Sequence, residues 1–160
     1  MFRIGIIGPE SSGKSTLAQY LAKRYNGVYI PEYAREFVER KGTTDVTWDE
    51  LCTIAKQQIE ELERLQTMEV GEQVFFFDTE LIITKVWFDY AFGRVPEWLE
   101  EAIRKYPMDV YLLCRPDIEW VADKARSNGD DKIRQELFER YEKEIEELGI
   151  PYYIIEHIRE

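Results

Sequence analysis

Residues 8–15 of this chain limit its possible folds more than any other stretch. They read Gly-Pro-Glu-Ser-Ser-Gly-Lys-Ser and match G-x-x-x-x-G-K-[ST], the pattern of a phosphate-binding loop. The apolar run 2–7 before the loop predicts a buried strand, and residues 16–25 after it predict a helix. The apolar stripe expected for this helix consists of Leu17, Tyr20, Leu21 and Tyr25. Because the motif requires a strand, a loop and a helix in this order, we favour it over a chance match in an ordinary loop.

The residue types of the loop suit a nucleoside triphosphate. Gly8 and Gly13 allow the close backbone approach that lets the loop's N–H groups surround phosphates. The N-terminus of the following helix adds positive charge. Lys14 is expected to reach the β- and γ-phosphates, and the Ser15 hydroxyl to ligate Mg²⁺. The residues predicted to bind the cofactors ATP and Mg²⁺ here are Gly8, Glu10, Ser11, Ser12, Gly13, Lys14, Ser15 and Thr16.

Length and composition predict one domain, residues 1–160, with a real core, since 44% of the residues are hydrophobic. The formal net charge of -11 argues against a nucleic-acid partner, because phosphate contacts need a basic surface. Cys52 and Cys114 are too few for a disulfide framework or a metal site, and we expect buried thiols. No apolar run approaches membrane-spanning length, and the N-terminus is unlike a signal peptide. We therefore expect a cytoplasmic protein with a small-molecule substrate and no membrane partner.

Strands and helices alternate along the chain. Further strands are predicted at residues 28–30, 74–77, 110–114 and 152–155. Helices are predicted at residues 31–41, 81–90, 96–106 and 133–148. A further helix, between the first two of these, is predicted to begin at residue 48 and to be ended by Gly71. Thr47 and Glu50 form a capping box at the start of the helix predicted from residue 48. The alternation predicts an α/β fold, a three-layer sandwich of P-loop kinase type with a five-stranded parallel sheet and helices on both faces.

Four stretches far apart in the sequence place polar residues at the ends of predicted strands. Ligands of such sheets bind at the carboxyl ends of the strands, where Gly8, Glu32, Asp78 and Arg115 all fall. Asp78 follows the most apolar strand and is expected to hold Mg²⁺, directly or through water. The alternative is that Asp78 caps the helix after it.

The residues after Asp78 bear on the type of reaction. Mechanical ATPases of the AAA type usually have a glutamate directly after this aspartate, to activate water. Here Thr79 takes that position and Glu80 comes one residue later. This difference favours phosphoryl transfer to a bound acceptor over hydrolysis that drives motion.

Glu32 is the candidate that positions the acceptor hydroxyl and takes its proton. Arg35 lies near it on the same predicted helical turn, and a simple surface ion pair between the two is the alternative. Flat aromatic rings near the same edge could stack on a base or belong to the core. These rings are Tyr33, Trp87, Tyr90 and Trp120.

The segment 121–134 contains four cations in an otherwise acidic chain and lies where small P-loop kinases carry a lid. We expect Arg126 and Arg134 to neutralise charge on the transferring phosphoryl group. Lys124 and Lys132 are expected to be solvated, and Asn128-Gly129 predicts a loop. The alternative is an exposed loop of mixed charge.

Several of these stretches combine into one pattern. They are residues 8–17, Pro-Glu-Tyr-Ala-Arg-Glu at 31–36, Phe-Asp-Thr-Glu at 77–80, and Trp-Val-Ala-Asp at 120–123 with Arg126 and Arg134. In this order they resemble the nicotinamide-riboside kinase domain that ends the bacterial NAD-regulator proteins and also occurs alone. The motifs cover nearly the whole chain, although Lys124 stands where the family's lid has a glycine.

The resemblance implies ATP-dependent phosphorylation of the 5′-hydroxyl of nicotinamide riboside, which gives nicotinamide mononucleotide for NAD biosynthesis. It implies catalytic roles for Lys14, Glu32, Asp78, Arg126 and Arg134. The residues expected near the substrate are Glu32, Tyr33, Arg35, Asp78 and Trp87. The adenylyltransferase and DNA-binding activities of the longer regulators are not expected. Two alternatives stay open: a kinase of another nucleoside or small metabolite, and a non-catalytic module that binds ATP and regulates a partner.

Overall fold

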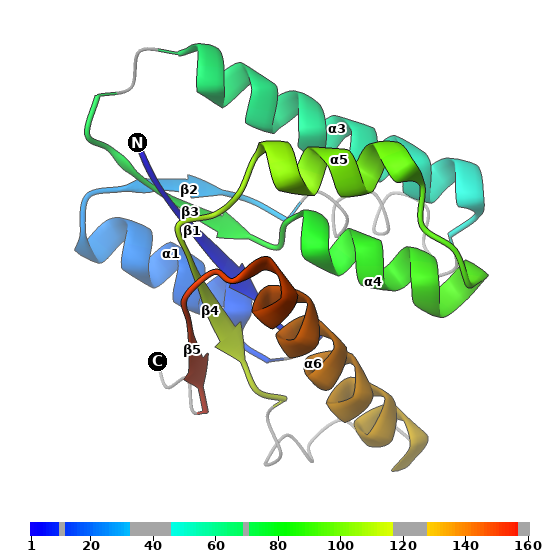
Figure 1. The fold of residues 1–160 in the computed structure, drawn as a ribbon. Coiled ribbons are helices and arrows are strands. Elements are labelled where there is room, and N and C mark those ends of the chain that lie inside the picture. Colours follow the sequence, from blue (N-terminus) through cyan, green and yellow to red (C-terminus); the bar gives the residue numbers. More distant parts are fainter. Residues whose placement is uncertain (10–11, 33–45, 69–70, 117–127, 157–160) are drawn as a thin grey trace.

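The protein is described by a computed structural model that covers residues 1–9, 12–32, 46–68, 71–116 and 128–156, with the backbone alone at 128–131. Its strands are β1 (Phe2–Ile7), β2 (Val28–Ile30), β3 (Val74–Asp78), β4 (Val110–Cys114) and β5 (Tyr152–Ile155). The helices among the described residues are α1 (Lys14–Arg24), α3 (Trp48–Thr67), α4 (Leu81–Phe92), α5 (Glu97–Lys105) and α6 (Asn128–Leu148). Figure 1 shows their arrangement.

The five strands form one parallel sheet in the order β2-β3-β1-β4-β5. β1 lies in the middle, with Ile4 opposite Phe76 of β3 on one side and Val110 of β4 on the other. All strands run in the same direction, so their carboxyl ends meet at one edge (Figure 1). The predicted five-stranded parallel sheet is confirmed.

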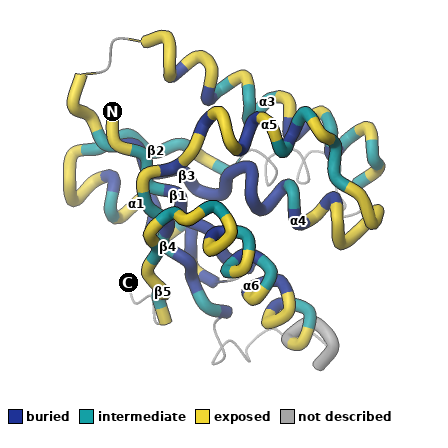
Figure 2. Tube along the Cα trace, in the orientation of Figure 1, coloured by how far each residue is buried: buried dark blue, intermediate teal, exposed yellow. Residues whose placement is uncertain are grey.

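Helices cover both faces of the sheet, as predicted. α1 packs on one face, whereas α4 and α6 lie on the other with α3 and α5 against α4 (Figures 1 and 2). Alternate residues of β3 serve the two layers: Phe75 and Phe77 join the large core under α3–α6, and Phe76 joins the small core under α1. The fold is therefore a three-layer α/β sandwich. Among the described residues, none of the helices is long and apolar enough to cross a membrane.

Local sequence signals explain where several helices begin and end. The predicted capping box is present at α3: Glu50 N–H donates to Thr47 Oγ1 at 3.2 Å, and Thr47 N–H donates to Glu50 Oε1 at 3.0 Å. α6 is followed by Gly149 at φ +72°, a left-handed angle that favours glycine. α3 ends at Thr67, however, four residues before the predicted stop at Gly71.

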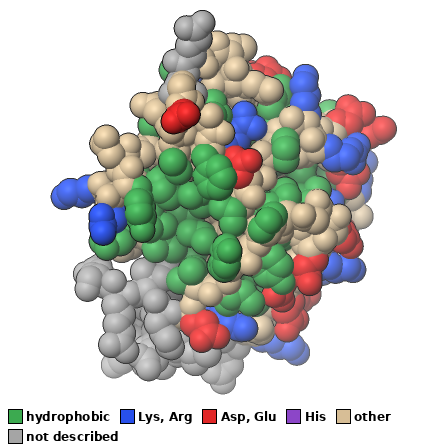
Figure 3. All heavy atoms as spheres, turned by 60° about the vertical axis from the view of Figure 1, so that its left-hand side comes forward, with side chains coloured by type: hydrophobic (Ala, Val, Ile, Leu, Met, Phe, Trp, Pro, Cys, Tyr) green, Lys and Arg blue, Asp and Glu red, His purple; other side chains and the backbone are tan. Residues whose placement is uncertain are grey.

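The predicted apolar stripe of the first helix is wrong in part. Tyr20 and Tyr25 are 61% and 63% exposed. The buried residues of α1 are Lys14, Ala18 and Ala22. They are spaced four residues apart from the start of the helix, so they lie on one face of it. Small alanines let the helix approach the sheet, and larger hydrophobic side chains stay at its flanks. Figure 3 shows hydrophobic side chains gathered on the face of the molecule that it views.

Two further predictions need correction. Asn128-Gly129 is not a loop but the start of α6, five residues before the predicted helix. Asparagine is favoured where helices begin, and the acidic pair after the glycine suits the positive end of a helix. Of the predicted lid, residues 128–134 are therefore helical, and 121–127 lie outside the described residues. Cys114 is buried as expected, whereas Cys52 is only half-buried.

Candidate active site

The phosphate-binding loop leaves β1 with a backbone that only glycine fits at two positions. A Cβ atom on Gly8 would lie 2.6 Å from the carbonyl oxygen of Cys114. Gly13, the residue before α1, has φ +81°, in the left-handed region. Glu10 and Ser11, predicted from the same motif, lie outside the described residues.

Polar side chains of the loop are buried in a way that suits a charged ligand. Lys14 is only 5% exposed, and so is Ser12. The hydroxyl oxygens of Ser12 and Ser15 are buried without a hydrogen-bond partner in the described part of the chain. Since native proteins pair nearly all such groups, these atoms indicate a ligand that completes the site. Thr16, the last loop residue predicted to touch nucleotide, is exposed on the first turn of α1.

Asp78, at the end of β3, is fully buried beside this loop. Its Oδ2 atom accepts a hydrogen bond of 2.8 Å from the hydroxyl of Tyr29, on the neighbouring strand β2. Its Oδ1 atom is buried and has no hydrogen-bond partner in the structure described. Burial raises the pKa of Cys114 to about 12, while Lys14 lowers it and Asp78 raises it, so both charged groups act at that thiol. One oxygen of Asp78 is thus held by Tyr29, and the other is available.

The alternative role of Asp78 as a helix cap is wrong. The N-cap of α4 is Glu80, whose Oε1 atom accepts from the N–H of Ile82 at 3.0 Å. Thr79 separates the two carboxylates and has φ +71°, which turns the chain sharply between strand and helix. Asp78 therefore has no capping bond to α4 and stays with the sheet.

The donor set fits Mg²⁺ bound together with phosphates. Mg²⁺ prefers oxygen ligands and is usually held by one or two protein side chains, with phosphates and water completing the shell. The Ser15 hydroxyl and Asp78 Oδ1 supply two such oxygens. No group of three or more His, Cys, Asp or Glu side chains that could hold a metal comes together in the ranges that the structure describes.

Glu80 is a site feature that the sequence analysis missed. Its carboxylate is buried and accepts a hydrogen bond of 3.0 Å from the Tyr111 hydroxyl. Burial raises the pKa of Glu80 to about 7, although the hydrogen bonds from Ile82 N–H and Tyr111 lower it. The available signal was a glutamate two residues after a buried strand, which the sequence analysis used only to argue against hydrolysis.

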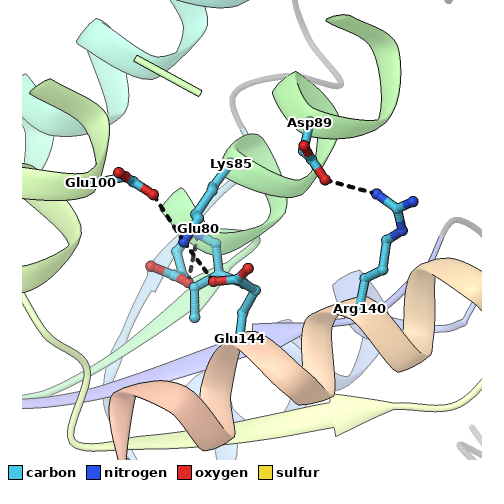
Figure 4. Close-up of polar contacts among 7 residues, drawn as sticks. Glu80, Lys85, Asp89, Glu100, Arg140 and Glu144 are labelled. Atoms are coloured by element: carbon cyan, nitrogen blue, oxygen red, sulfur yellow. Dashed lines mark hydrogen bonds and ion pairs between the residues drawn. The ribbon is translucent and has the colours of Figure 1, made fainter. Parts of the chain in front are cut away.

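Ion pairs hold the helices around Glu80 together (Figure 4). Lys85 of α4 contacts Glu144 of α6 at 2.7 Å and Glu100 of α5 at 3.4 Å. One turn further along α4, Asp89 contacts Arg140 of α6 at 3.1 Å. These ion pairs therefore tie α4, which Glu80 caps, to α5 and α6.

A cavity of about 230 Å³ opens at the carboxyl ends of β2 and β3, against one face of α3. Its walls are mainly apolar, with a few polar groups. Lining residues include Ile30, Pro31, Gln57, Leu62, Phe77 and Thr79. Phe77 and Thr79 are the chain neighbours of Asp78, so the cavity lies at the end of β3, next to the residue that carries the buried carboxylate.

Two residues predicted near the substrate are described by the structure: Glu32 is next to the cavity lining, and Trp87 is on α4. Glu32 is half-buried and directly follows Pro31, which lines the cavity. Trp87 is 38% exposed on α4 and meets Tyr90 edge-on, with ring centroids 5.7 Å apart. Burial raises the pKa of Tyr141, a hydrogen bond with Trp87 lowers it, and the charge of Glu32 raises it. Glu32 and Trp87 therefore both act at the Tyr141 hydroxyl.

The remaining predicted residues are spread along the chain. Arg134 is buried on α6, with 5% exposure, and Lys132 is exposed as predicted. Arg115 does follow β4, but it pairs with Glu156 at 3.3 Å and stacks over Phe138. The predictions that lie outside the described residues concern Tyr33, Arg35, Trp120, Lys124 and Arg126.

Comparison with known proteins agrees with this geometry. A family model described as an AAA domain matches residues 3–160. The chain belongs to this AAA-domain family. It is 28% identical over 159 residues, 96% of its length, to the "Trifunctional NAD biosynthesis/regulator protein NadR" of Escherichia coli (strain K12). The chain spans only 38% of that relative.

Solved structures that include a nucleotide kinase share the fold of this chain. A crystal structure of NadR in complex with NR superposes with a TM-score of 0.73 at 25% identity, over 96% of this chain and 45% of NadR. NadR in complex with NAD and AMP-PNP gives a TM-score of 0.75 at 23% identity, over 98% of this chain and 44% of that chain. Thymidylate kinase from Ehrlichia chaffeensis gives a TM-score of 0.67 at 15% identity, over 99% of this chain and 88% of the kinase. These likenesses confirm the fold class and the resemblance to the bacterial NAD-regulator type.

Proposed function

We propose that this protein transfers the γ-phosphoryl group of ATP to the 5′-hydroxyl of nicotinamide riboside. The observation that carries the proposal is the junction of two features at one sheet edge. The first is the set of Lys14, Ser15 and Asp78: Lys14 and Asp78 are buried, and Ser15 Oγ and Asp78 Oδ1 have no hydrogen-bond partner among the described residues. The second is the adjacent apolar cavity, which starts at the residues on both sides of Asp78.

The nucleotide side of the site is built for phosphates. Backbone N–H groups of the loop at 8–15 and the N-terminus of α1 bind the phosphate oxygens. The buried ammonium of Lys14 neutralises charge on the β- and γ-phosphates. Ser15 and Asp78 hold Mg²⁺, and Tyr29 orients Asp78 by holding its second oxygen. Bound Mg²⁺ supplies further neutralisation of the phosphate charge.

The acceptor side of the site positions a riboside. The cavity takes the flat ring, and its apolar walls exclude water from the reacting groups. Glu32, at the edge of the cavity, accepts the proton of the 5′-hydroxyl as it attacks phosphorus. Trp87, Tyr33 and Arg35 contribute to riboside binding in this proposal, and Arg126 and Arg134 neutralise the transferring phosphoryl group.

Ligands of the relatives support this choice of substrates. NadR has been crystallised with NR and, separately, with NAD and AMP-PNP. This chain aligns with NadR over 96% of its own length in the first of these structures. We extend the NR and ATP-analogue sites of NadR to this chain, and the cavity and the buried loop cluster are where we place them.

The test is ADP release from Mg-ATP, alone and with a panel of nucleosides that includes nicotinamide riboside. Lys14→Ala provides the blank for contaminating activity. We expect nicotinamide riboside to stimulate release above every other nucleoside. Stimulation by a different acceptor would replace the substrate but keep a kinase. No stimulation by any acceptor, with ATP still bound, would contradict the proposal and favour a regulatory module.

A further inference from the structure

Gln57, on the face of α3 that lines the cavity, has a buried side-chain oxygen. Its side-chain oxygen Oε1 has no hydrogen-bond partner within the described part of the molecule. The neighbouring Gln58 is different, because its Oε1 accepts a 2.6 Å hydrogen bond from Thr84. Both glutamines line the cavity, but only the Oε1 of Gln58 is used to tie α3 to α4.

Thr79, another residue of the cavity lining, also has a buried side-chain atom without a partner among the described residues. This atom is the hydroxyl oxygen, and Thr79 lines the cavity from the end of β3. Buried polar atoms without partners are uncommon in native proteins. Two of them around one cavity indicate that a ligand supplies the missing partners.

We propose that Gln57 recognises a carboxamide on the ring of the acceptor and is a specificity-determining residue of this cavity. The inference rests on the proposed riboside kinase activity and adds the chemistry by which the acceptor is selected. It does not depend on any residue outside the described ranges.

The chemistry of the amide group explains the match. A glutamine side chain carries an acceptor oxygen and a donor NH₂ group in one plane, and so does a carboxamide. Two such groups can pair with each other through two hydrogen bonds. Which end of Gln57 faces the cavity does not matter, because both orientations find a partner in a carboxamide. The Thr79 hydroxyl can donate or accept one more bond.

The rest of the lining suits a flat ring that carries an uncharged carboxamide and disfavours a ring that carries a carboxylate. Ile30, Leu62 and Phe77 provide apolar surface for the faces of the ring. Among the described residues, the lining includes Glu61 and Glu80 and contains neither lysine nor arginine. A carboxylate in place of the carboxamide would therefore be buried near acidic residues without a cation. The selected class is a riboside of an aromatic carboxamide.

The wall that carries Gln57 is held in place independently of any ligand. Gln58 bonds Thr84 of α4, and Leu62 on the next turn of α3 is buried in the main core. Gln57 can therefore be changed without removing the contacts that fix α3. This makes substitution at Gln57 a clean test of recognition.

The test compares two acceptors that differ only in the carboxamide: nicotinamide riboside and pyridine riboside. For wild-type protein, we expect kcat/KM to be at least about tenfold lower with pyridine riboside, because the amide hydrogen bonds are lost. Gln57→Leu is expected to lower kcat/KM for nicotinamide riboside to the pyridine riboside level. It should leave the value for pyridine riboside and the KM for ATP unchanged.

Matched variants separate recognition from folding. Gln66→Leu makes the same change at an exposed position of α3 and should behave as wild type. Gln57→Met keeps the shape of the side chain, so it should reproduce the result of Gln57→Leu if the latter folds poorly. Melting temperatures of all variants are measured alongside.

Two results would overturn the inference while leaving the proposed function in place. One is equal kcat/KM for the two acceptors in wild-type protein. The other is an equal fall for both acceptors in the Gln57 variants, which indicates a structural role. If wild-type protein phosphorylates neither nicotinamide riboside nor pyridine riboside, the proposed function itself is overturned, and this inference with it.

Discussion

Asp78 has its two carboxylate oxygens in different situations, and this difference leads to a prediction at the scale of single residues. Tyr29 donates to Oδ2 at 2.8 Å, whereas Oδ1, the proposed Mg²⁺ ligand, has no hydrogen-bond partner among the described residues. Tyr29→Phe removes that hydrogen bond and keeps the ring. We expect the Mg²⁺ concentration for half-maximal ADP release to rise about threefold to tenfold, because Asp78 is no longer oriented.

Nucleotide affinity without Mg²⁺ provides the readout that a general folding defect would also change. It should stay at the wild-type value in Tyr29→Phe. The matched control is Tyr153→Phe on the exposed surface of β5, which should leave both measurements unchanged. An unaltered Mg²⁺ requirement in Tyr29→Phe would exclude the orienting role.

Glu32 is the residue on which proton removal depends in the proposed reaction. Glu32→Gln keeps the size of the side chain and removes its ability to take a proton. We expect kcat to fall by about a hundredfold or more while ATP binds as before. Steady-state kinetics and nucleotide titration measure the two effects separately. Retained turnover would remove Glu32 from the mechanism.

Glu80 makes stability depend on pH in a direction opposite to that of a salt-bridged carboxylate. Its pKa is about 7 in the fold, against 4.5 for the free side chain. Between these pH values the folded state keeps a proton that the unfolded state loses, so this group's contribution falls as pH rises from about 4.5 to about 7. The expected loss is about 3 kcal/mol of unfolding free energy.

The measurement is denaturant unfolding at several pH values across that window. Glu80→Gln keeps an oxygen that can accept from Ile82 N–H, and it should flatten the pH dependence. Glu63→Gln, at an exposed position of α3, should keep the wild-type slope. The same slope in Glu80→Gln as in wild type would show that other groups cause it.

At the scale of elements, capping determines how firmly α3 presents its face to the cavity. Thr47→Ala removes the side chain that accepts from Glu50 N–H and should cost about 1 kcal/mol of stability. Thr53→Ala, on the same helix with its hydroxyl on the carbonyl of Asp49, should change stability by less than about 0.5 kcal/mol. Equal effects of the two changes in urea unfolding would contradict the capping argument.

Element boundaries also show where reasoning from sequence works and where it fails. The capping box at Thr47 and the glycine after α6 were predictable, because each is a local signal with a local cause. The face of α1 was not, because it begins with the buried charged residue Lys14, which hydropathy places at the surface. Asn128-Gly129 predicts a loop because this pair is typical of turns, but the same pair can start a helix, as it does at α6.

At the scale of the whole molecule, the sheet order brings the site together. β3 lies between β1 and β2, so Asp78 is next to the phosphate-binding loop on one side and to Tyr29 on the other. The motif at 8–15 and the alternation of strands and helices were sufficient for the fold. The contacts of Tyr29 and Glu80 were not predictable, because they join strands whose order the sequence does not state.

The central claim is transfer of phosphate to the 5′-hydroxyl of nicotinamide riboside. The most direct measurement is mass spectrometry of the products after incubation with Mg-ATP, using the 5′-deoxy analogue of the riboside as the control acceptor. The account predicts nicotinamide mononucleotide and ADP in equal amounts, and no phosphorylated product from the 5′-deoxy analogue. ADP formed without mononucleotide, or a phosphorylated 5′-deoxy analogue, would contradict it.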